Sequence, residues 1–124
     1  MILEANVTIM VSDVDRAIEF YTKILGLGLR ERYGSKYAEV QVDGFIIALH
    51  LKNSKHQVPA ETANLFIGFR VEKLESSIAD LKIKGAKVSG EVEEGVAGRF
   101  FYFVDPDGNP LYLWQKKSQE DPSV

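Results

Sequence analysis

The sequence of 124 residues contains no cysteine. A chain without thiols forms no disulfide, no thiolate zinc site and no iron–sulfur cluster, and it has no cysteine nucleophile. Histidine, another common ligand of transition metals, occurs only at His50 and His56. The scarcity of these two residue types excludes thiol chemistry and leaves few side chains for metal chemistry.

The chain also lacks an excess of positive charge. Its 15 Lys and Arg stand against 18 Asp and Glu, for a net charge of −3, so we expect no nucleic-acid partner. Apolar runs such as residues 45–49 are far shorter than the ~20 residues that cross a bilayer. Residues 1–4 do not have the pattern of a signal peptide. We therefore expect a cytoplasmic protein with no membrane partner.

What the sequence does contain is enough apolar material for one folded domain. Apolar residues make up 45% and charged residues 27%, a balance typical of globular domains. The order strand, helix and three strands occurs twice, and Val11 and Ile18 have counterparts in Val71 and Ile78. We predict a single domain over 1–124, with modules at about 3–57 and 62–115 and a tail at 116–124.

The elements of the first module are predicted from alternation and turn residues. Residues 6–11 alternate as a half-buried strand. Ser12 and Asp15 have the spacing of a capping box before a helix that ends at Gly26. Asp43-Gly44 is typical of a tight hairpin turn. Further strands are expected at residues 27–33, 37–42 and 45–52.

The second module is predicted in the same way. Residues 65–71 alternate as a strand, and Leu74, Ile78 and Leu81 mark a helix face that Gly85 closes. The run Asp105-Pro106-Asp107-Gly108 has the residues that a type I turn favours, and we expect it only to reverse the chain. Further strands are expected at residues 87–91, 99–104 and 111–114.

These features together resemble one family. Two βαβββ modules, the run Asp13…Phe20-Tyr21…Leu25-Gly26 and the late 105–109 turn resemble the vicinal oxygen chelate superfamily, the glyoxalase, bleomycin resistance protein and extradiol dioxygenase group. The resemblance covers about residues 3–115. It implies an α+β fold in which both modules form a curved, barrel-like mixed sheet with the helices outside. It also implies, commonly, a homodimer with pockets inside the sheet.

The metal of the superfamily's enzymes is held by His, Glu or Gln and acts as a Lewis acid. The corresponding positions in this chain are Asn6, Ala48, Phe66 and Tyr112. Alanine and phenylalanine have no donor atom, the amide oxygen is a weak ligand, and tyrosine would have to lose its proton. A rebuilt site from His50 and Glu39 would lack a third protein ligand. We expect no metal and no cofactor, and we expect His56 to be a solvated loop residue.

Alternation separates each strand into two faces. One face is uniformly apolar and is expected to pack under the helices; it carries Val7, Ile9, Val11, Ile47, Leu49, Ile67, Phe69, Val71, Leu111 and Leu113. The opposite face is small, aromatic and hydrogen-bonding; it carries Asn6, Thr8, Met10, Ala48, His50, Phe66, Gly68, Arg70, Tyr112 and Trp114.

The second face suits a flat organic molecule, because aromatic rings stack on such a ligand and a few polar groups orient it. We predict a metal-free protein that binds a small organic molecule, of the bleomycin-resistance type, and sequesters an antibiotic-like or aromatic compound. The predicted ligand-binding residues are Asn6, Thr8, Ala48, His50, Phe66, Tyr112 and Trp114.

Two other functions remain open. The chain is alternatively a lyase, isomerase or dioxygenase-type enzyme of the same superfamily, with a rebuilt metal site or with His50 and Tyr112 in acid–base chemistry. In the third possible function, side chains fill the interior of the fold and the surface of the protein binds another protein. Arg99, after the small-residue loop 95–98, is a candidate contact for an anion and the loop a candidate lid. Arg70 is expected to be a surface charge.

Overall fold

The computed structural model describes residues 1–52 and 65–117. The chain divides into two compact units, Met1–Ala63 and Asn64–Val124. The expected polar link at 53–62, with His56, and most of the expected tail lie outside the described residues. Within the described residues, no helix has the length and apolar character to span a membrane.

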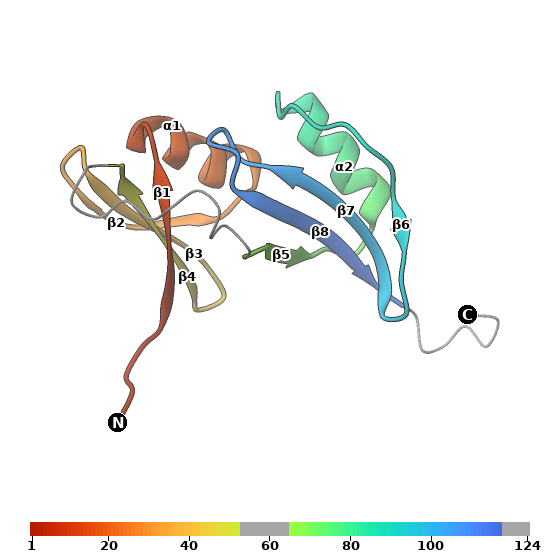
Figure 1. The fold of residues 1–124 in the computed structure, drawn as a ribbon, viewed down its shortest axis with the longest axis horizontal. Coiled ribbons are helices and arrows are strands. Elements are labelled where there is room, and N and C mark those ends of the chain that lie inside the picture. Colours follow the sequence, from red (N-terminus) through yellow and green to blue (C-terminus); the bar gives the residue numbers. More distant parts are fainter. Residues whose placement is uncertain (53–64, 118–124) are drawn as a thin grey trace. The chain divides into compact units, whose positions relative to one another are not determined.

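The first unit is a four-stranded mixed sheet with one helical segment against one of its faces (Figure 1). The strand order is β1-β4-β3-β2; β1 is parallel to β4, and the other neighbours are antiparallel. The elements in chain order are β1 (Asn6–Val11), α1 (Val14–Glu19), the π-helical segment η1 (Phe20–Ile24), β2 (Gly28–Tyr33), β3 (Tyr37–Val42) and β4 (Phe45–Leu51).

The N-cap of the first helix lies one residue later than predicted. Asp13, not Ser12, is the N-cap, and its side chain accepts a hydrogen bond from the backbone N–H of Arg16. Ser12 instead accepts from the guanidinium of Arg16 at 2.9 Å. Both Ser and Asp are favoured at the N-cap, so the cap lies one residue after the expected one, and the third helical residue is Arg16, which does not complete a capping box. Gly26 ends the helical segment at a φ of 85°, as expected.

The hairpin between β3 and β4 is confirmed. Asp43 and Gly44 have φ values of 46° and 83°, the left-handed conformation that a type I′ hairpin turn requires at both central positions. The turn sets the register in which Val40 pairs with Ile47 and Ala38 with Leu49. Because these four side chains share one face, the turn also determines which residues of both strands enter the core.

The core of the first unit lies between this face of the sheet and the helical segment. Side chains at most 5% exposed come from both layers. They remove large apolar surfaces from water, which is the main favourable term in folding. They are Val11, Val14, Ala17, Phe20, Tyr21, Ala38, Val40, Ile47 and Leu49.

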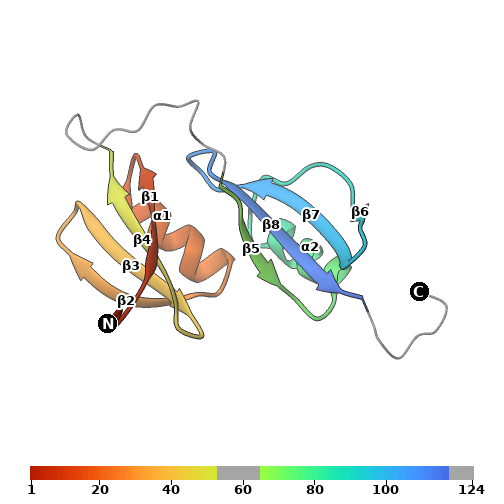
Figure 2. The same cartoon turned by 60° about the horizontal axis from the view of Figure 1, so that its bottom comes forward.

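The second unit repeats the arrangement, with strand order β5-β8-β7-β6 and β5 parallel to β8. Figure 2 shows α2 across one face of β7 and β8. Its core contains Leu74, Ile78, Leu81, Phe101, Phe103, Leu111 and Leu113. The elements are β5 (Ile67–Arg70), α2 (Leu74–Ile83), β6 (Glu93–Glu94), β7 (Gly98–Val104) and β8 (Pro110–Lys116).

The strand expected at residues 87–91 is wrong. The strand in this place is the two-residue β6, Glu93–Glu94, which pairs with Phe100 and Arg99. Gly90 has a φ of 109°, which interrupts the extended conformation before a ladder can form. Residues 87–91 therefore belong to the loop between α2 and β6.

The turn before β8 is confirmed. The backbone N–H of Gly108 donates to the carbonyl of Asp105 at 3.0 Å. The side chain of Asp105, only 3% exposed, accepts from the N–H groups of Asp107 and Asn109 and from the amide of Asn109. A buried carboxylate with this many donors is well satisfied, so the turn has a structural role.

The predicted α+β class and the βαβββ order of both modules are confirmed. The strands of the described residues form two curved four-stranded sheets rather than one closed barrel. In each unit the helix covers one face, and the opposite face carries the predicted ligand-binding residues. We call the latter the open face of that sheet.

Candidate functional site

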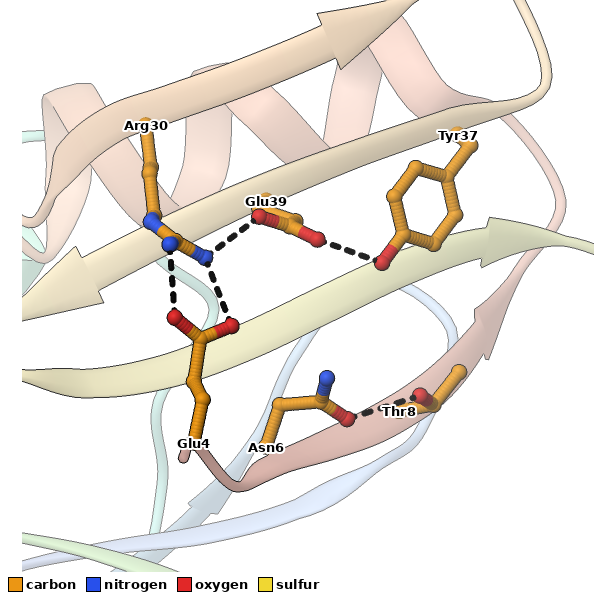
Figure 3. A network of polar contacts seen from close by, with 6 residues as sticks. All are labelled: Glu4, Asn6, Thr8, Arg30, Tyr37 and Glu39. Atoms are coloured by element: carbon orange, nitrogen blue, oxygen red, sulfur yellow. Dashed lines mark hydrogen bonds and ion pairs between the residues drawn. The ribbon is translucent and has the colours of Figure 1, made fainter. Parts of the chain in front are cut away.

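The open face of the first sheet brings together the four predicted residues of the first unit. Thr8 pairs with Ala48 across β1 and β4, and Met10 pairs with His50. Asn6 lies two residues before Thr8 in β1 and therefore on the same face. The hydroxyl of Thr8 donates to the amide oxygen of Asn6 at 3.4 Å (Figure 3). Ala48 presents only a methyl group and is fully buried, so the polar atoms of this set come from its neighbours.

His50 is oriented by the backbone. Its Nδ1 lies 2.8 Å from the carbonyl oxygen of Leu51, and because a carbonyl only accepts, Nδ1 carries the proton of the neutral ring. The ring of Tyr37 meets the imidazole edge-on, with centroids 6.1 Å apart. These contacts hold the imidazole on the open face with Nε2 as the acceptor of the neutral ring.

A charged network that the sequence analysis did not assign occupies the same face (Figure 3). Arg30 of β2 is 2.8 Å from both Glu4 and Glu39, and the hydroxyl of Tyr37 donates to Glu39 at 2.7 Å. Glu39 pairs with Ala48 across β3 and β4. That register decides the facing of Glu39, which sequence alternation alone left open.

Tyr37 titrates abnormally because of this network. Its hydrogen bond to Glu39, its partial burial and the negative charge of Glu39 raise the pKa of Tyr37 to about 12. A phenolate beside a carboxylate is unfavourable, since both would be negative and the hydrogen bond would lose its donor. Tyr37 therefore remains a neutral donor far above neutral pH.

The consequence is a pH-dependent term in stability. Because the pKa is raised above its ordinary value of 10.0, the stabilisation from Tyr37 should be complete below pH 10 and decline as the pH rises towards about 12. Absorbance titration of tyrosinate should show a late step whose amplitude falls by one tyrosine in Tyr37→Phe and is unchanged in Tyr33→Phe. A late step of unchanged amplitude in Tyr37→Phe would contradict the assignment.

The open face of the second sheet is aromatic. Phe66 precedes β5, and Tyr112 and Trp114 lie on β8; β7 adds Phe100 and Tyr102, which pair with Trp114 and Tyr112. Neighbouring rings have centroids 5.5 to 6.5 Å apart, and the planes of Phe100 and Trp114 differ by 11°. The predicted residues of this unit are thus joined by two aromatic residues that the sequence analysis did not assign.

Two glycines make room for these rings. A Cβ on Gly68 would lie 2.5 Å from Cε2 and 2.6 Å from the hydroxyl oxygen of Tyr112. A Cβ on Gly95 would lie 2.8 Å from the ring of Phe100. Tyr112 therefore lies across the backbone of β5, a position that any side chain at residue 68 would take from it.

A pocket of about 320 Å³ adjoins the aromatic face. This volume is at the lower end of the range for small-molecule sites, which is roughly 300–1,000 Å³. The walls combine two exposed rings, one of them a phenol, with apolar side chains, one ammonium group and one aliphatic hydroxyl group. Its lining residues are Phe66, Lys87, Ser89, Tyr102, Phe103, Val104 and Pro110.

The expectation for Arg99 is wrong. Its guanidinium forms ion pairs with Glu75 of α2 and Glu94 of β6, and these carboxylates raise the pKa of Arg99. Arg99 alternates with Phe101 on β7 and therefore lies on the helix side of the sheet, so its guanidinium is not part of the open face that carries the predicted ligand-binding residues. Arg70, as expected, is an exposed charge at the end of β5.

Residues 5–113 match the family model of the Glyoxalase/Bleomycin resistance protein/Dioxygenase superfamily. The chain belongs to this superfamily. A glutathione transferase FosA from Serratia marcescens is 25% identical over 108 residues, 87% of this chain and 77% of the relative. The uncharacterised protein YwkD of Bacillus subtilis (strain 168) is 28% identical over 121 residues, 90% of this chain and 94% of the relative.

Solved structures share the superfamily fold. A superfamily member from Sphaerobacter thermophilus is 22% identical, with a TM-score of 0.72 over 94% of this chain and 98% of its own. TnmS3, an antibiotic binding protein from Streptomyces sp. CB03234, is 22% identical, with a TM-score of 0.70 over 94% of this chain and 99% of its own.

The donor set does not fit the metal of the superfamily's enzymes. Two of the four corresponding residues, Ala48 and Phe66, have no atom that could coordinate. Among residues 1–52 and 65–117, no three His, Cys, Asp or Glu side chains come together in a way that could hold a metal ion. Metal chemistry at this centre is therefore not supported by the residues present.

Proposed function

We propose that this protein binds a small planar aromatic compound, without a metal, and sequesters it rather than transforming it. The observation that carries the proposal is the aromatic open face of the second sheet. Five rings lie within contact of one another there, yet Phe66 and Tyr102 remain 55% and 42% exposed. Exposed rings beside a pocket are what a planar ligand requires, because stacking adds to the burial of apolar area.

Polar groups at the pocket of the second unit would orient the compound. Lys87 and Ser89 border the pocket and would contribute one charge and one hydroxyl group. Taken by itself, the open face of the first unit offers hydrogen-bonding groups from Asn6, Thr8 and His50 beside the small Ala48. A predominantly apolar lining with few polar groups is the usual composition of a ligand site.

One of the structural relatives supports an antibiotic-like ligand. TnmS3 is described as an antibiotic binding protein. Binding of this kind needs no nucleophile and no metal, and the residues at the superfamily's metal positions here supply neither. We therefore propose that this chain is one of the binding proteins of the superfamily. We also propose that it acts in the cytoplasm and that it assembles as a homodimer.

An enzyme of the same superfamily is the alternative, and the orientation of His50 favours it. The hydrogen bond of Nδ1 to a carbonyl fixes the tautomer, as it does for histidines that act as bases through Nε2. His50→Gln separates the two functions, because it keeps hydrogen bonding and removes the imidazole that would act as the base.

The proposal is tested by a ligand screen. We expect planar aromatic compounds to quench the fluorescence of Trp114, the single tryptophan, and to raise the unfolding temperature through preferential binding to the folded state. His50→Gln should leave the affinity nearly unchanged. Loss of turnover of a bound compound in His50→Gln, at retained affinity, would instead establish the enzyme. Absence of quenching and stabilisation across planar compounds would contradict the binding function.

A further inference from the structure

Arg30 holds a carboxylate in the arrangement that a ligand carboxylate would take. Its Nη2 lies 2.8 Å from Oε2 of Glu4, and its Nη1 lies 3.3 Å from Oε1 of the same side chain (Figure 3). Nη1 is also 2.8 Å from Oε1 of Glu39. Two guanidinium nitrogens facing two oxygens of one carboxylate is the forked geometry by which arginine recognises carboxylates.

The two carboxylates around Arg30 differ in how they are held. Glu39 lies within β3, which is paired on both sides, its side chain is 14% exposed, and its second oxygen accepts from Tyr37. Glu4 precedes β1, outside any strand, and its side chain is 50% exposed. Exposed ion pairs contribute little, so Glu4 can leave while Glu39 keeps the guanidinium in place.

We propose that Arg30 is a binding residue for a carboxylate-bearing small molecule, and that Glu4 occupies the site until such a ligand displaces it. This inference goes beyond the proposed function, because it assigns an anion site to the first unit alone. It makes the open face of the first sheet a recognition surface rather than a closed surface network.

The charges favour a monoanion. With Glu4 in place, the cluster of Glu4, Arg30 and Glu39 has one net negative charge. Exchange of Glu4 for a ligand carboxylate leaves that charge unchanged, whereas a dianion such as a phosphate monoester would add a second negative charge beside Glu39. Repulsion between this second charge and the carboxylate of Glu39 opposes binding, so the site should prefer carboxylates to phosphates.

The test uses benzoate as the probe and benzamide as its neutral counterpart of similar shape. Both are titrated into the full-length protein at about pH 6, where carboxylates are ionised. The readout is the NMR signal of the backbone amides of Arg30 and Glu39, with the Nε–Hε signal of Arg30 in addition. Benzoate should shift these signals saturably, and benzamide and sulfate, which is a dianion at this pH, should have a much weaker effect.

Two variants separate displacement from general charge effects. Glu4→Gln removes the competing charge and should tighten benzoate binding, by no more than about fivefold because exposed ion pairs are weak. Glu19→Gln removes an equal charge from an exposed helical position and should not change the affinity.

Arg30 itself is tested with a matched arginine. Arg30→Met should weaken benzoate binding by about tenfold or more, because the charge-assisted hydrogen bonds are lost. Arg32→Met on the same strand, whose guanidinium pairs with Asp15 at 2.5 Å, should have no effect.

Equal binding of benzoate and benzamide, or an unchanged or weaker benzoate affinity in Glu4→Gln, would overturn the inference. If Trp114 still responds to planar compounds in that case, the proposed function stands and only the anion site fails.

Discussion

Replacing Tyr112 with alanine should weaken the binding of a planar aromatic probe such as 2-naphthol by about 5- to 150-fold. The ring of Tyr112 contacts Phe66, Phe100 and Tyr102 at centroid distances of 5.5 to 6.5 Å, so it lies at the centre of the aromatic face. Its removal takes away both stacking and buried area, which together contribute ~1–3 kcal/mol. Quenching of Trp114 fluorescence provides the dissociation constant.

Two further variants give this measurement its control. Phe45→Ala removes an exposed ring of the first unit, 43% exposed, and should leave the affinity unchanged. Gly68→Ala keeps Tyr112 but displaces its ring, because a Cβ there would lie 2.6 Å from the hydroxyl oxygen; its affinity should fall towards that of Tyr112→Ala. Normal binding by both Tyr112→Ala and Gly68→Ala would refute the assignment of the aromatic face.

The faces of three strands were predictable because their alternation is clean. In β1, β5 and β8, apolar side chains alternate with small, polar or aromatic ones, and a period of two places each set on one side of the sheet. The observed register, with Thr8 opposite Ala48 and Gly68 opposite Tyr112, agrees with that assignment. The pattern is informative because the two faces differ in chemistry.

Strand β7 carries no such contrast. Residues 100–103 are four consecutive aromatic residues. Alternation alone therefore does not show which two of these rings belong to the core and which two to the open face. Pairing with β8 resolves the question, because Phe100 lies opposite Trp114 and Tyr102 opposite Tyr112. The sequence therefore predicted three members of the aromatic cluster, Phe66, Tyr112 and Trp114, but not the two members on β7.

Arg30 was hidden for a different reason. The register of β2 against β3 shifts between Leu29 and Glu31, and an extra residue at such a bulge reverses the facing that alternation predicts. Arg99 was misread because its partners are set by tertiary structure: Glu75 lies 24 residues away on α2. A single sequence contains no local signal for either contact.

Leu113→Ala should cost the protein ~2–5 kcal/mol of unfolding free energy, a large part of the stability of a domain of this size. Leu113 is 4% exposed and lies between Phe69 and Phe101 on the helix-covered face, so its truncation leaves a cavity in the core of the second unit. Urea unfolding gives the free energy. Leu65→Ala, at a leucine 67% exposed in the same unit, should change it by no more than about 0.5 kcal/mol. The loss of unfolding free energy in Tyr112→Ala should lie between those of Leu113→Ala and Leu65→Ala. Tyr112 is next to Leu113 on β8, but its side chain is on the opposite face and is only partly buried. A greater loss of stability in Tyr112→Ala than in Leu113→Ala would mean that the aromatic face is a second core rather than a ligand surface.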